Sequence, residues 1–227
     1  MSYPVPENEA KRIAALKHYQ ILDSAPEAAY DDIVAIAAYI TGSPIAAVSL
    51  IDVDRQWFKA KVGLAKPATP REQAFCAHTI LQTEVMEVED AAADTRFSNN
   101  PLVTGEPHIR FYAGAPLITP DGHALGSVCI IDQNPRKLSS EQKDALKKLA
   151  RLVMNNLELR RVSAELAEAI ANVKTLSGLL PICSWCKQVR DDQGYWHQVE
   201  AYLKNHTEAT FTHGVCAKCA EKFHSGT

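Results

Sequence analysis

The chain has 227 residues, enough for one full domain and a second, smaller one, and its hydrophobic share of 46% is that of an ordinary soluble protein. Its formal net charge of −3 gives no basic character of the kind that binds nucleic acid or an anionic membrane. No apolar run reaches the length of a membrane span or of a signal sequence. We therefore expect a cytoplasmic protein that binds neither nucleic acid nor membrane.

Hydrophobic periodicity divides the first part of the chain into helices and strands. Apolar side chains every three or four residues predict amphipathic helices, and short runs rich in β-branched residues predict strands. The predicted helices cover residues 6–22, 30–41 and 72–81, and the predicted strands cover residues 45–51, 56–62, 85–88, 108–118 and 124–131. The polar stretch from Asp90 to Gly105 is long for a loop in a compact domain, and such loops are usually functional. The order of elements predicts an α+β domain built on an antiparallel sheet.

A long helix is predicted to begin at Ser139 or Ser140, where Glu141 and Gln142 can complete a capping box, and to end at Gly178. Apolar side chains follow a three-four step along it, which is the spacing of a coiled-coil seam. The seam consists of Leu152, Leu159, Val162, Leu166, Ala169, Val173, Leu176 and Leu180, with Asn155 between the first two. A narrow seam with one asparagine predicts a parallel homodimer. The alternative is a solvated spacer whose first turns pack on the preceding domain.

Four motifs in the first domain occur in the order found in one family of sensory domains. They are Ser49 to Lys59, Phe75 to His78, Asp94 to Pro101 and Ile109 to Leu117. Together they closely resemble a bacterial subgroup of GAF domains, over about residues 6–159. The resemblance implies a sheet of five or six strands with helices on one face and a cupped pocket on the other. It also implies a sensory module that dimerises through its terminal helices and acts upstream of a histidine kinase, a diguanylate cyclase or a phosphatase.

The pocket implied by this resemblance is expected to combine aromatic surface with a few polar groups. Aromatic rings provide contact area and arginine provides paired hydrogen bonds, a combination that suits a planar or anionic small molecule. The residues expected to contact this unknown ligand are Trp57, Phe58, Phe75, His78, Phe97, Arg110 and Tyr112. Each also fits a structural role, the aromatic residues in the core and the arginine as the partner of a nearby aspartate.

Two isolated cysteines leave an enzymatic alternative open. Some GAF domains reduce free methionine sulfoxide with cysteines, and Cys76 and Cys129 are candidates for such chemistry. The chain lacks the glycine-flanked cysteine pattern of those reductases, and Cys129 lies in an apolar run, where cysteine packs as a small hydrophobic side chain. A bilin pigment is not expected either, because Ala77 separates Cys76 from His78.

Four cysteines near the C-terminal end form two Cys-x-x-Cys pairs. The pairs are Cys183 with Cys186 and Cys216 with Cys219. In a reducing compartment such pairs are metal ligands more often than disulfides, and four thiolates suit a tetrahedral Zn²⁺ site with no open position. A disulfide, iron or a redox pair are the alternatives, and His213 or His224 can replace one cysteine. We expect a structural zinc site in a module too small for a sufficient core of its own.

This module resembles a small C-terminal unit found after PAS, GAF and receiver domains, on the residues Leu179 to Lys187, Asp191 to Trp196 and Thr212 to Cys216. Its positive and negative charges balance, which argues against DNA binding and favours protein docking. The complete prediction is a non-enzymatic signalling protein with a GAF sensor over residues 1–138, a signalling helix over 139–180 and a zinc module over 181–227. We expect a homodimer that acts on a downstream signalling protein.

Overall fold

The structure is a computed structural model that describes residues 3–172, 180–207 and 210–224. The chain forms two compact units, residues 1–164 and residues 165–227. Among the described helices, none combines the length and the apolar character that a membrane span requires.

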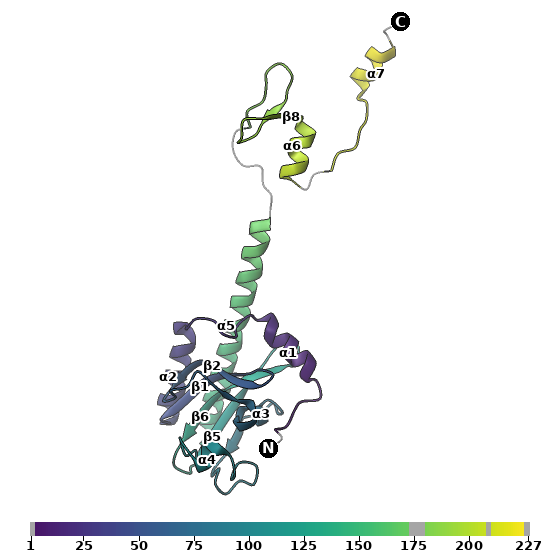
Figure 1. Ribbon diagram of the computed structural model, residues 1–227. Coiled ribbons are helices and arrows are strands. Elements are labelled where there is room, and N and C mark those ends of the chain that lie inside the picture. Colours follow the sequence, from purple (N-terminus) through teal and green to yellow (C-terminus); the bar gives the residue numbers. More distant parts are fainter. Residues whose placement is uncertain (1–2, 173–179, 208–209, 225–227) are drawn as a thin grey trace. The chain divides into compact units, whose positions relative to one another are not determined.

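A six-stranded antiparallel sheet forms the centre of the first unit (Figure 1). Its strands, in chain order, are β1 (Ile45–Ile51), β2 (Arg55–Val62), β3 (Ala68–Pro70), β4 (Met86–Val88), β5 (Phe111–Ile118) and β6 (Ala124–Asp132). Their order across the sheet is β3-β2-β1-β6-β5-β4, so that the two shortest strands lie at the edges. The predicted strands are confirmed, but β3 was not expected, because a three-residue strand is too short to show a period in the sequence.

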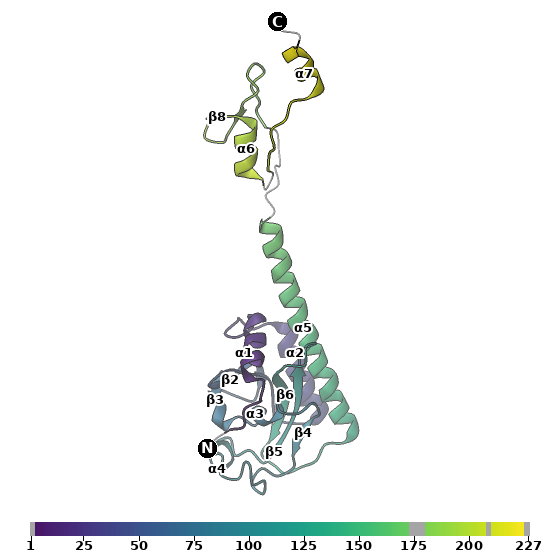
Figure 2. The same cartoon turned by 90° about the vertical axis from the view of Figure 1, so that its right-hand side faces the viewer.

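Helices and loops cover both faces of this sheet (Figure 2). The helices of the first unit are α1 (Glu9–His18), α2 (Ala28–Thr41), α3 (Cys76–Thr79), α4 (Pro101–Thr104) and α5 (Ser140–Asn172), whose residues 165–172 belong to the second unit, with one 3-10 turn, η1 (Arg71–Gln73), before α3. Side chains of α1, α2 and the first half of α5 share one core with the sheet, which we call the helix-side core. Side chains of α3, α4 and the neighbouring loops share a second core with the other face, the loop-side core.

Successive side chains of a strand point to opposite faces, and they divide between the two cores accordingly. Trp57 and Phe111 lie in the helix-side core, whereas Phe58 and Tyr112 lie in the loop-side core. Because both faces are covered, every residue of β1 is buried. Double coverage explains why this strand appears in the sequence as a continuous apolar run and not as an alternating pattern.

Helix α5 begins with the predicted capping box. The backbone N–H of Gln142 donates to Ser139 Oγ (3.3 Å), and the backbone N–H of Ser139 donates to Gln142 Oε1 (3.1 Å). The first half of the helix then packs on the sheet, and the side chains that it buries in the helix-side core are Leu146, Leu149, Ala150, Val153, Met154 and Leu157.

A second stripe on α5 is exposed within its own chain. Leu152, Leu159, Val162 and Leu166 are 50%, 70%, 49% and 59% exposed. These are members of the predicted seam, and they lie on a different side of the helix from the buried stripe. The further seam members Val173 and Leu176 and the predicted helix end at Gly178 lie outside the described residues, and Leu180 lies outside α5.

The second unit contains a small hairpin and two short helices. Its elements are β7 (Val189–Arg190), β8 (Trp196–His197), α6 (Val199–His206) and α7 (Ala217–His224). Asp191 shapes the hairpin turn, because its Oδ1 accepts the backbone N–H groups of Gln193 (3.0 Å) and Tyr195 (2.8 Å). Gly194 occupies the left-handed position of this turn, with φ of 91°.

Candidate functional site

The loop-side core contains a mostly apolar cavity of about 50 Å³. The side chains that line it come from β2, β3, β5, β6, α3 and α4 and from neighbouring loops, and they are Gln56, Phe58, Leu64, Thr69, Phe75, Cys76, Leu102, Pro107, Ile109, Tyr112 and Ile131. Pockets for drug-sized ligands have volumes of about 300–1,000 Å³. In this conformation the cavity therefore has room only for a molecule of a few heavy atoms.

One wall of the cavity is a cluster of buried polar side chains around Cys76. The Cys76 sulfur accepts hydrogen bonds from Gln56 Nε2 (3.1 Å) and from the Tyr112 hydroxyl (3.2 Å). Thr79 Oγ1 lies 2.6 Å from the same hydroxyl, and because Tyr112 donates to the sulfur, Thr79 donates to Tyr112. None of these four side chains is more than 5% exposed. They form a hydrogen-bonded network that ends on a sulfur atom.

Three further groups interact with the Cys76 thiol and favour its charged form: Ser49 from β1, and Ser127 and Cys129 from β6. Burial raises the pKa of Cys76, but the hydrogen bonds, that from Cys129 first, outweigh burial and lower the pKa to about 6. The hydrogen bond to Cys76, together with burial, raises the pKa of Cys129 well above its ordinary value. Near neutral pH the cluster therefore favours a thiolate on Cys76 and a thiol on Cys129.

Glycine at position 114 makes room for this network. A side chain there would place its Cβ 2.3 Å from the Tyr112 hydroxyl and 3.0 Å from Thr79 Oγ1. Two residues of the cluster were not predicted from the sequence: Ser49 and Ser127, which face each other in the pairing of β1 with β6. The signal that could have identified them is a serine inside an apolar strand, where a hydroxyl needs a hydrogen-bond partner.

The structure divides the predicted ligand-binding residues among several places. Phe58, Phe75 and Tyr112 line the cavity. His78 and Phe97 line a separate surface hollow of about 450 Å³. The rings of Phe75 and Phe97 are stacked with their centroids 4.0 Å apart, so that this ring pair connects the wall of the cavity to the wall of the hollow.

Trp57 and Arg110 have other surroundings. Trp57 lies in the helix-side core, on the opposite face of β2 from Phe58. Arg110 directly precedes β5, and its Nη1 donates to the carbonyl oxygens of Val103 (2.9 Å) and Ile109 (3.0 Å). These bonds hold the loop that contains α4 against the start of β5.

The surface hollow offers little free positive charge. Arg96, which lies over the Phe97 ring at 5.0 Å from its centroid, pairs with Asp94 at 2.6 Å. Burial lowers the pKa of His78, and the nearby Arg96 lowers it further. The hollow thus presents an arginine whose charge is already paired and an imidazole that is neutral near pH 7.

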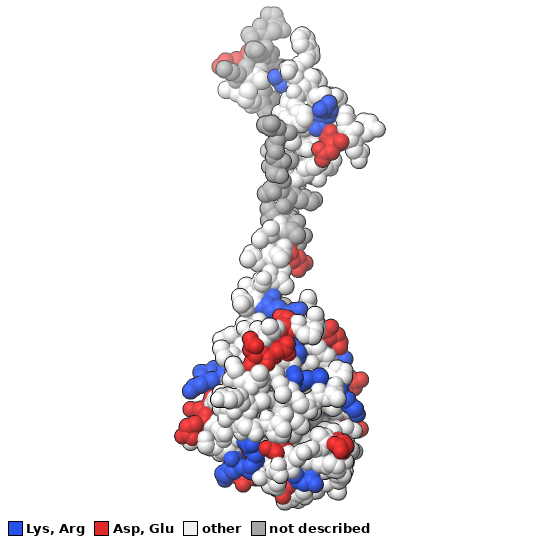
Figure 3. All heavy atoms as spheres, turned by 90° about the vertical axis from the view of Figure 1, so that its left-hand side faces the viewer, with Lys and Arg blue, Asp and Glu red and all other residues white. Residues whose placement is uncertain are grey.

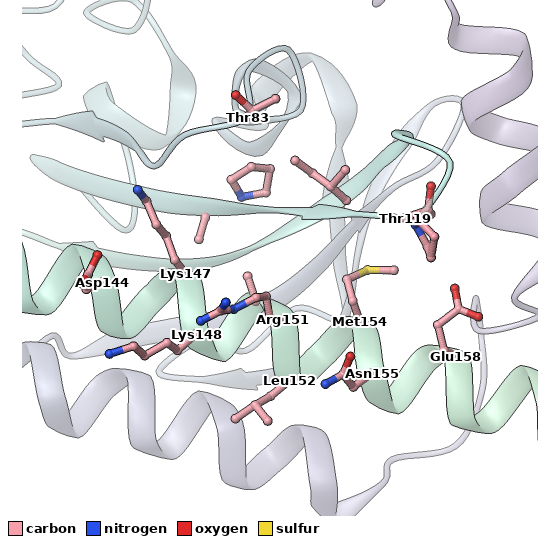
Figure 4. A pocket seen from close by; sticks show the side chains of 15 residues that line it. Thr83, Thr119, Asp144, Lys147, Lys148, Arg151, Leu152, Met154, Asn155 and Glu158 are labelled. Atoms are coloured by element: carbon pink, nitrogen blue, oxygen red, sulfur yellow. The ribbon is translucent and has the colours of Figure 1, made fainter.

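A larger groove of about 990 Å³ lies between α5 and the sheet edge near the turn from β5 to β6. Lys147, Arg151 and Met154 of α5 line it. In Figure 4, Lys147 and Met154 point from the helix toward the strands, whereas Leu152 points away from them. Lys147 also pairs with Glu84 at 2.5 Å. The groove therefore combines apolar surface with charges that are partly neutralised.

The surface of the first unit carries charges of both signs. Figure 3 shows Lys and Arg next to Asp and Glu over the face in view. Some of these side chains form ion pairs, such as Arg55 with Asp23 and Lys143 with Glu87, each at 2.6 Å. Mixed charges of this kind do not create the extended positive potential that attracts nucleic acid.

The first cysteine pair of the second unit lies in a tight turn before β7. Backbone hydrogen bonds from Cys183 N to Gln188 O (2.8 Å) and from Lys187 N to Cys183 O (3.0 Å) close the turn, and Lys187 has φ of 61°. The backbone N–H of Cys186 donates to the Cys183 sulfur (3.5 Å). Backbone donors at Cys186 and Trp185 lower the pKa of Cys183. Such a turn favours the thiolate, which is the form that binds metal.

The second cysteine pair lies at the start of α7. Cys216 directly precedes the helix and Cys219 lies in its first turn, where the Cys219 N–H donates to the Cys216 carbonyl oxygen (2.9 Å). Four thiols of this kind are the donor set that a tetrahedral zinc site requires. Over the described ranges, no three Cys, His, Asp or Glu side chains lie close enough together to hold a metal ion.

Comparison with known protein families places the cavity in a known kind of domain. The GAF domain family matches residues 25–157, a range that contains the whole six-stranded sheet and every residue that lines the cavity. The chain belongs to the GAF domain family. The α+β fold and the sensory family expected from the sequence are thereby confirmed.

A curated relative extends well beyond this GAF domain. The chain is 45% identical over 159 residues to a protein named cyclic di-GMP phosphodiesterase PA2567, from Pseudomonas aeruginosa, and the match covers 70% of this chain and 27% of the relative. The chain therefore spans about a quarter of the length of this relative.

Two solved structures share the GAF fold. One is the GAF domain of an Acinetobacter phosphoenolpyruvate-protein phosphotransferase, with 16% identity over 76% of this chain and 100% of that chain and a TM-score of 0.50. The other is a free methionine-R-sulfoxide reductase from Neisseria meningitidis, with 15% identity over 72% of this chain and 98% of that chain and a TM-score of 0.50. At these identities the likeness concerns the fold alone.

One prediction from the sequence is corrected by these comparisons. The sequence predicted a non-enzymatic signalling protein, but the relative with 45% identity is named as an enzyme. The prediction is wrong because a GAF fold does not dictate whether the protein that contains it is an enzyme. The relative also contains far more chain than the segment matched here.

Proposed function

We propose that this chain is a signal-transduction module in which the GAF domain binds a small molecule and α5 carries the resulting change to a zinc-stabilised, protein-docking module. The observation that carries the proposal is the division of α5 into two stripes. One stripe is buried in the helix-side core, and the other is exposed among the residues that the structure describes, with Leu159 at 70%. In a helix with this division, the buried stripe responds to changes in the packing of the domain, and the exposed stripe can pair with another helix.

The partner that best suits the exposed stripe is a second copy of the same helix. The stripe keeps the three-four spacing of a coiled-coil seam from Leu152 to Leu166. In a parallel pair each seam residue meets its own counterpart, so the two Asn155 side chains face each other and can hydrogen-bond. A single polar pair of this kind favours two helices in register.

Strand β6 provides the route from the cavity to α5. Cys129 and Ile131 lie on the cavity side of β6, while Val128 and Ile130 lie in the same helix-side core as the buried stripe of α5. A small shift of β6 therefore changes the packing both around the cavity and against the buried stripe of α5. A ligand biases the packing of α5 only if it binds one packing more tightly than the other.

We assign a structural zinc ion to the two cysteine pairs, Cys183 with Cys186 and Cys216 with Cys219. The turn with backbone N–H groups directed at Cys183 supports the assignment, as does the position of the second pair at the start of a helix. Zinc would supply a tetrahedral cross-link between these two segments and thereby stabilise a unit with a small core. Nearby apolar side chains are exposed, among them Ile182, Phe211 and Val215, and such a cross-link gives them a surface to pack on.

The kinship with a protein named cyclic di-GMP phosphodiesterase supports a place in cyclic di-GMP signalling. We propose that the downstream partner is an enzyme that makes or degrades cyclic di-GMP. The partner's activity then depends on the packing of α5, and the zinc module provides the docking surface.

Cysteine cross-linking tests the pairing of α5. Leu166→Cys places a thiol in the seam, whereas Glu168→Cys places a thiol at another exposed position about 200° further around the helix, on its opposite side. Under mild oxidation we expect a covalent dimer from the first variant and only the background of the unsubstituted chain from the second. Equal cross-linking of both variants, or none of either, would contradict the parallel pair.

A further inference from the structure

Cys76 has more hydrogen-bonding partners than a buried cysteine requires. Its sulfur contacts Gln56, Tyr112, Cys129, Ser49 and Ser127, which come from four strands of the sheet. Each polar group placed in an apolar core costs free energy unless it is paired. Here these groups converge on one sulfur atom, which accepts hydrogen bonds weakly as a thiol and strongly as a thiolate.

We propose that Cys76 is the sensing residue of the GAF cavity: a small hydroperoxide oxidises its sulfur, and Cys129 then forms a disulfide with it. This inference rests on the proposed sensory function and deepens it, because it names the class of molecule that the domain detects.

The size of the cavity selects for a small oxidant. Cys76 forms part of its wall, and the volume is about 50 Å³, whereas a cavity of about 10–15 Å³ already holds one water molecule. Hydrogen peroxide, with two heavy atoms, fits this space. A bulky disulfide such as oxidised glutathione does not, and Cys76 is only 1% exposed.

The chemistry balances with the two cysteines and one peroxide. The Cys76 thiolate attacks one peroxide oxygen, so that an S–O bond forms, the O–O bond breaks and hydroxide leaves with the electron pair. The sulfur is oxidised to a sulfenic acid, and the hydroxide takes a proton to become water. Cys129 then attacks the Cys76 sulfur, the S–S bond forms, and the departing hydroxide takes the Cys129 proton to give a second water.

The disulfide would join two elements that the relay requires. Cys76 lies on α3 and Cys129 lies on β6, whose neighbouring residues Val128 and Ile130 pack in the same core as α5. Pulling β6 toward α3 therefore changes the surface on which α5 rests. The five polar neighbours explain why the reaction starts at Cys76: they stabilise its thiolate, whereas Cys129 keeps its proton.

The test is oxidation of the full chain by hydrogen peroxide, followed by mass spectrometry of peptides without reduction, so that each cysteine is detected separately. We expect Cys76 and Cys129 to appear in one linked pair of peptides after about one equivalent of peroxide. In Cys129→Ser, which lacks the second thiol, dimedone added together with denaturant after the oxidation, so that it can reach a buried sulfur, should instead label Cys76 as a sulfenic acid. Both residues remaining free thiols in folded protein under excess peroxide would overturn the proposal.

A second pair of variants separates thiol activation from mere accessibility. Tyr112→Phe removes one hydrogen bond to the thiolate and should slow the oxidation of Cys76 about tenfold. Thr41→Val is the matched control, because it removes an equally buried hydroxyl that bonds to Ala37 O (2.7 Å), away from the cluster, and it should leave the rate unchanged. Equal rates in both variants would also overturn the proposal. If Cys76 is not oxidised but Leu166→Cys still forms the covalent dimer, this inference alone is rejected. If Cys76 is oxidised but Leu166→Cys forms no dimer, only the pairing of α5 is rejected.

Discussion

Leu157 and Leu159 are two positions apart on α5 but have opposite surroundings. Leu157 is 1% exposed in the helix-side core, whereas Leu159 is 70% exposed. Truncation of a buried leucine to alanine removes transfer free energy and leaves a cavity, at a cost of about 2.7–5 kcal/mol. We therefore expect Leu157→Ala to lower the free energy of unfolding of the GAF domain by about 3 kcal/mol, independently of protein concentration.

Leu159→Ala should act on association instead. In a single chain it removes little buried surface, so the free energy of unfolding in dilute solution should change by no more than about 0.5 kcal/mol. In a parallel pair it removes two facing leucines from the seam. The dissociation constant of the dimer should then rise at least about tenfold, which corresponds to about 1.4 kcal/mol.

Two measurements check this pair of substitutions: urea denaturation followed by circular dichroism, and sedimentation equilibrium over a range of concentrations. Equal loss of stability from both substitutions in dilute protein would mean that Leu159 is buried within its own chain. An unchanged dissociation constant for Leu159→Ala would mean that α5 does not pair through this stripe.

Three further predictions concern other parts of the chain. Burial raises the pKa of Glu9, but hydrogen bonds from Arg12 and Arg71 outweigh burial and lower the pKa to about 2. The ionised Glu9 therefore contributes its full stabilisation of the folded state above pH 4.5, and this contribution is lost as the pH falls toward 2. In Glu9→Gln this pH-dependent loss should be absent from the acid denaturation curve. Lys59 is buried and its Nζ donates to three oxygen atoms in the segment between α1 and α2, so Lys59→Met should cost about 2 kcal/mol in urea denaturation. Removal of zinc with a chelator should increase amide hydrogen exchange over residues 181–227 and leave the exchange of the GAF domain unchanged. Unchanged exchange in both parts of the chain would count against a structural metal.

Local sequence patterns were sufficient for most of the regular elements. Strand β1 has the predicted bounds, and α5 starts with the predicted capping box, because period and capping depend on residues that are close in sequence. The edge strand β3 was missed for the opposite reason. Its three residues form a strand only because they pair with β2, and that pairing is a property of the folded sheet.

Local sequence patterns did not predict which side chains of the candidate site face the cavity. Trp57 and Phe58 are adjacent aromatic residues that were both predicted to contact a ligand, yet they lie on opposite faces of the sheet. Which of the two faces the cavity depends on the register of β2 in the complete sheet. Arg110 likewise looked suited to an anion, but the folded loop supplies two carbonyl oxygens that occupy its guanidinium group.

By itself, the sequence determined the order of the elements, the resemblance to GAF domains and the heptad spacing of α5, since each is encoded over a short window or in a set of ordered motifs. Tertiary structure decided which side chains meet. Gln56 and Tyr112 lie 20 and 36 positions from Cys76, and nothing in that separation indicates that all three share one hydrogen-bonded cluster. Hydrogen bonds act only at contact distance, and the pairing of strands and the packing of α3 on the sheet bring these groups together.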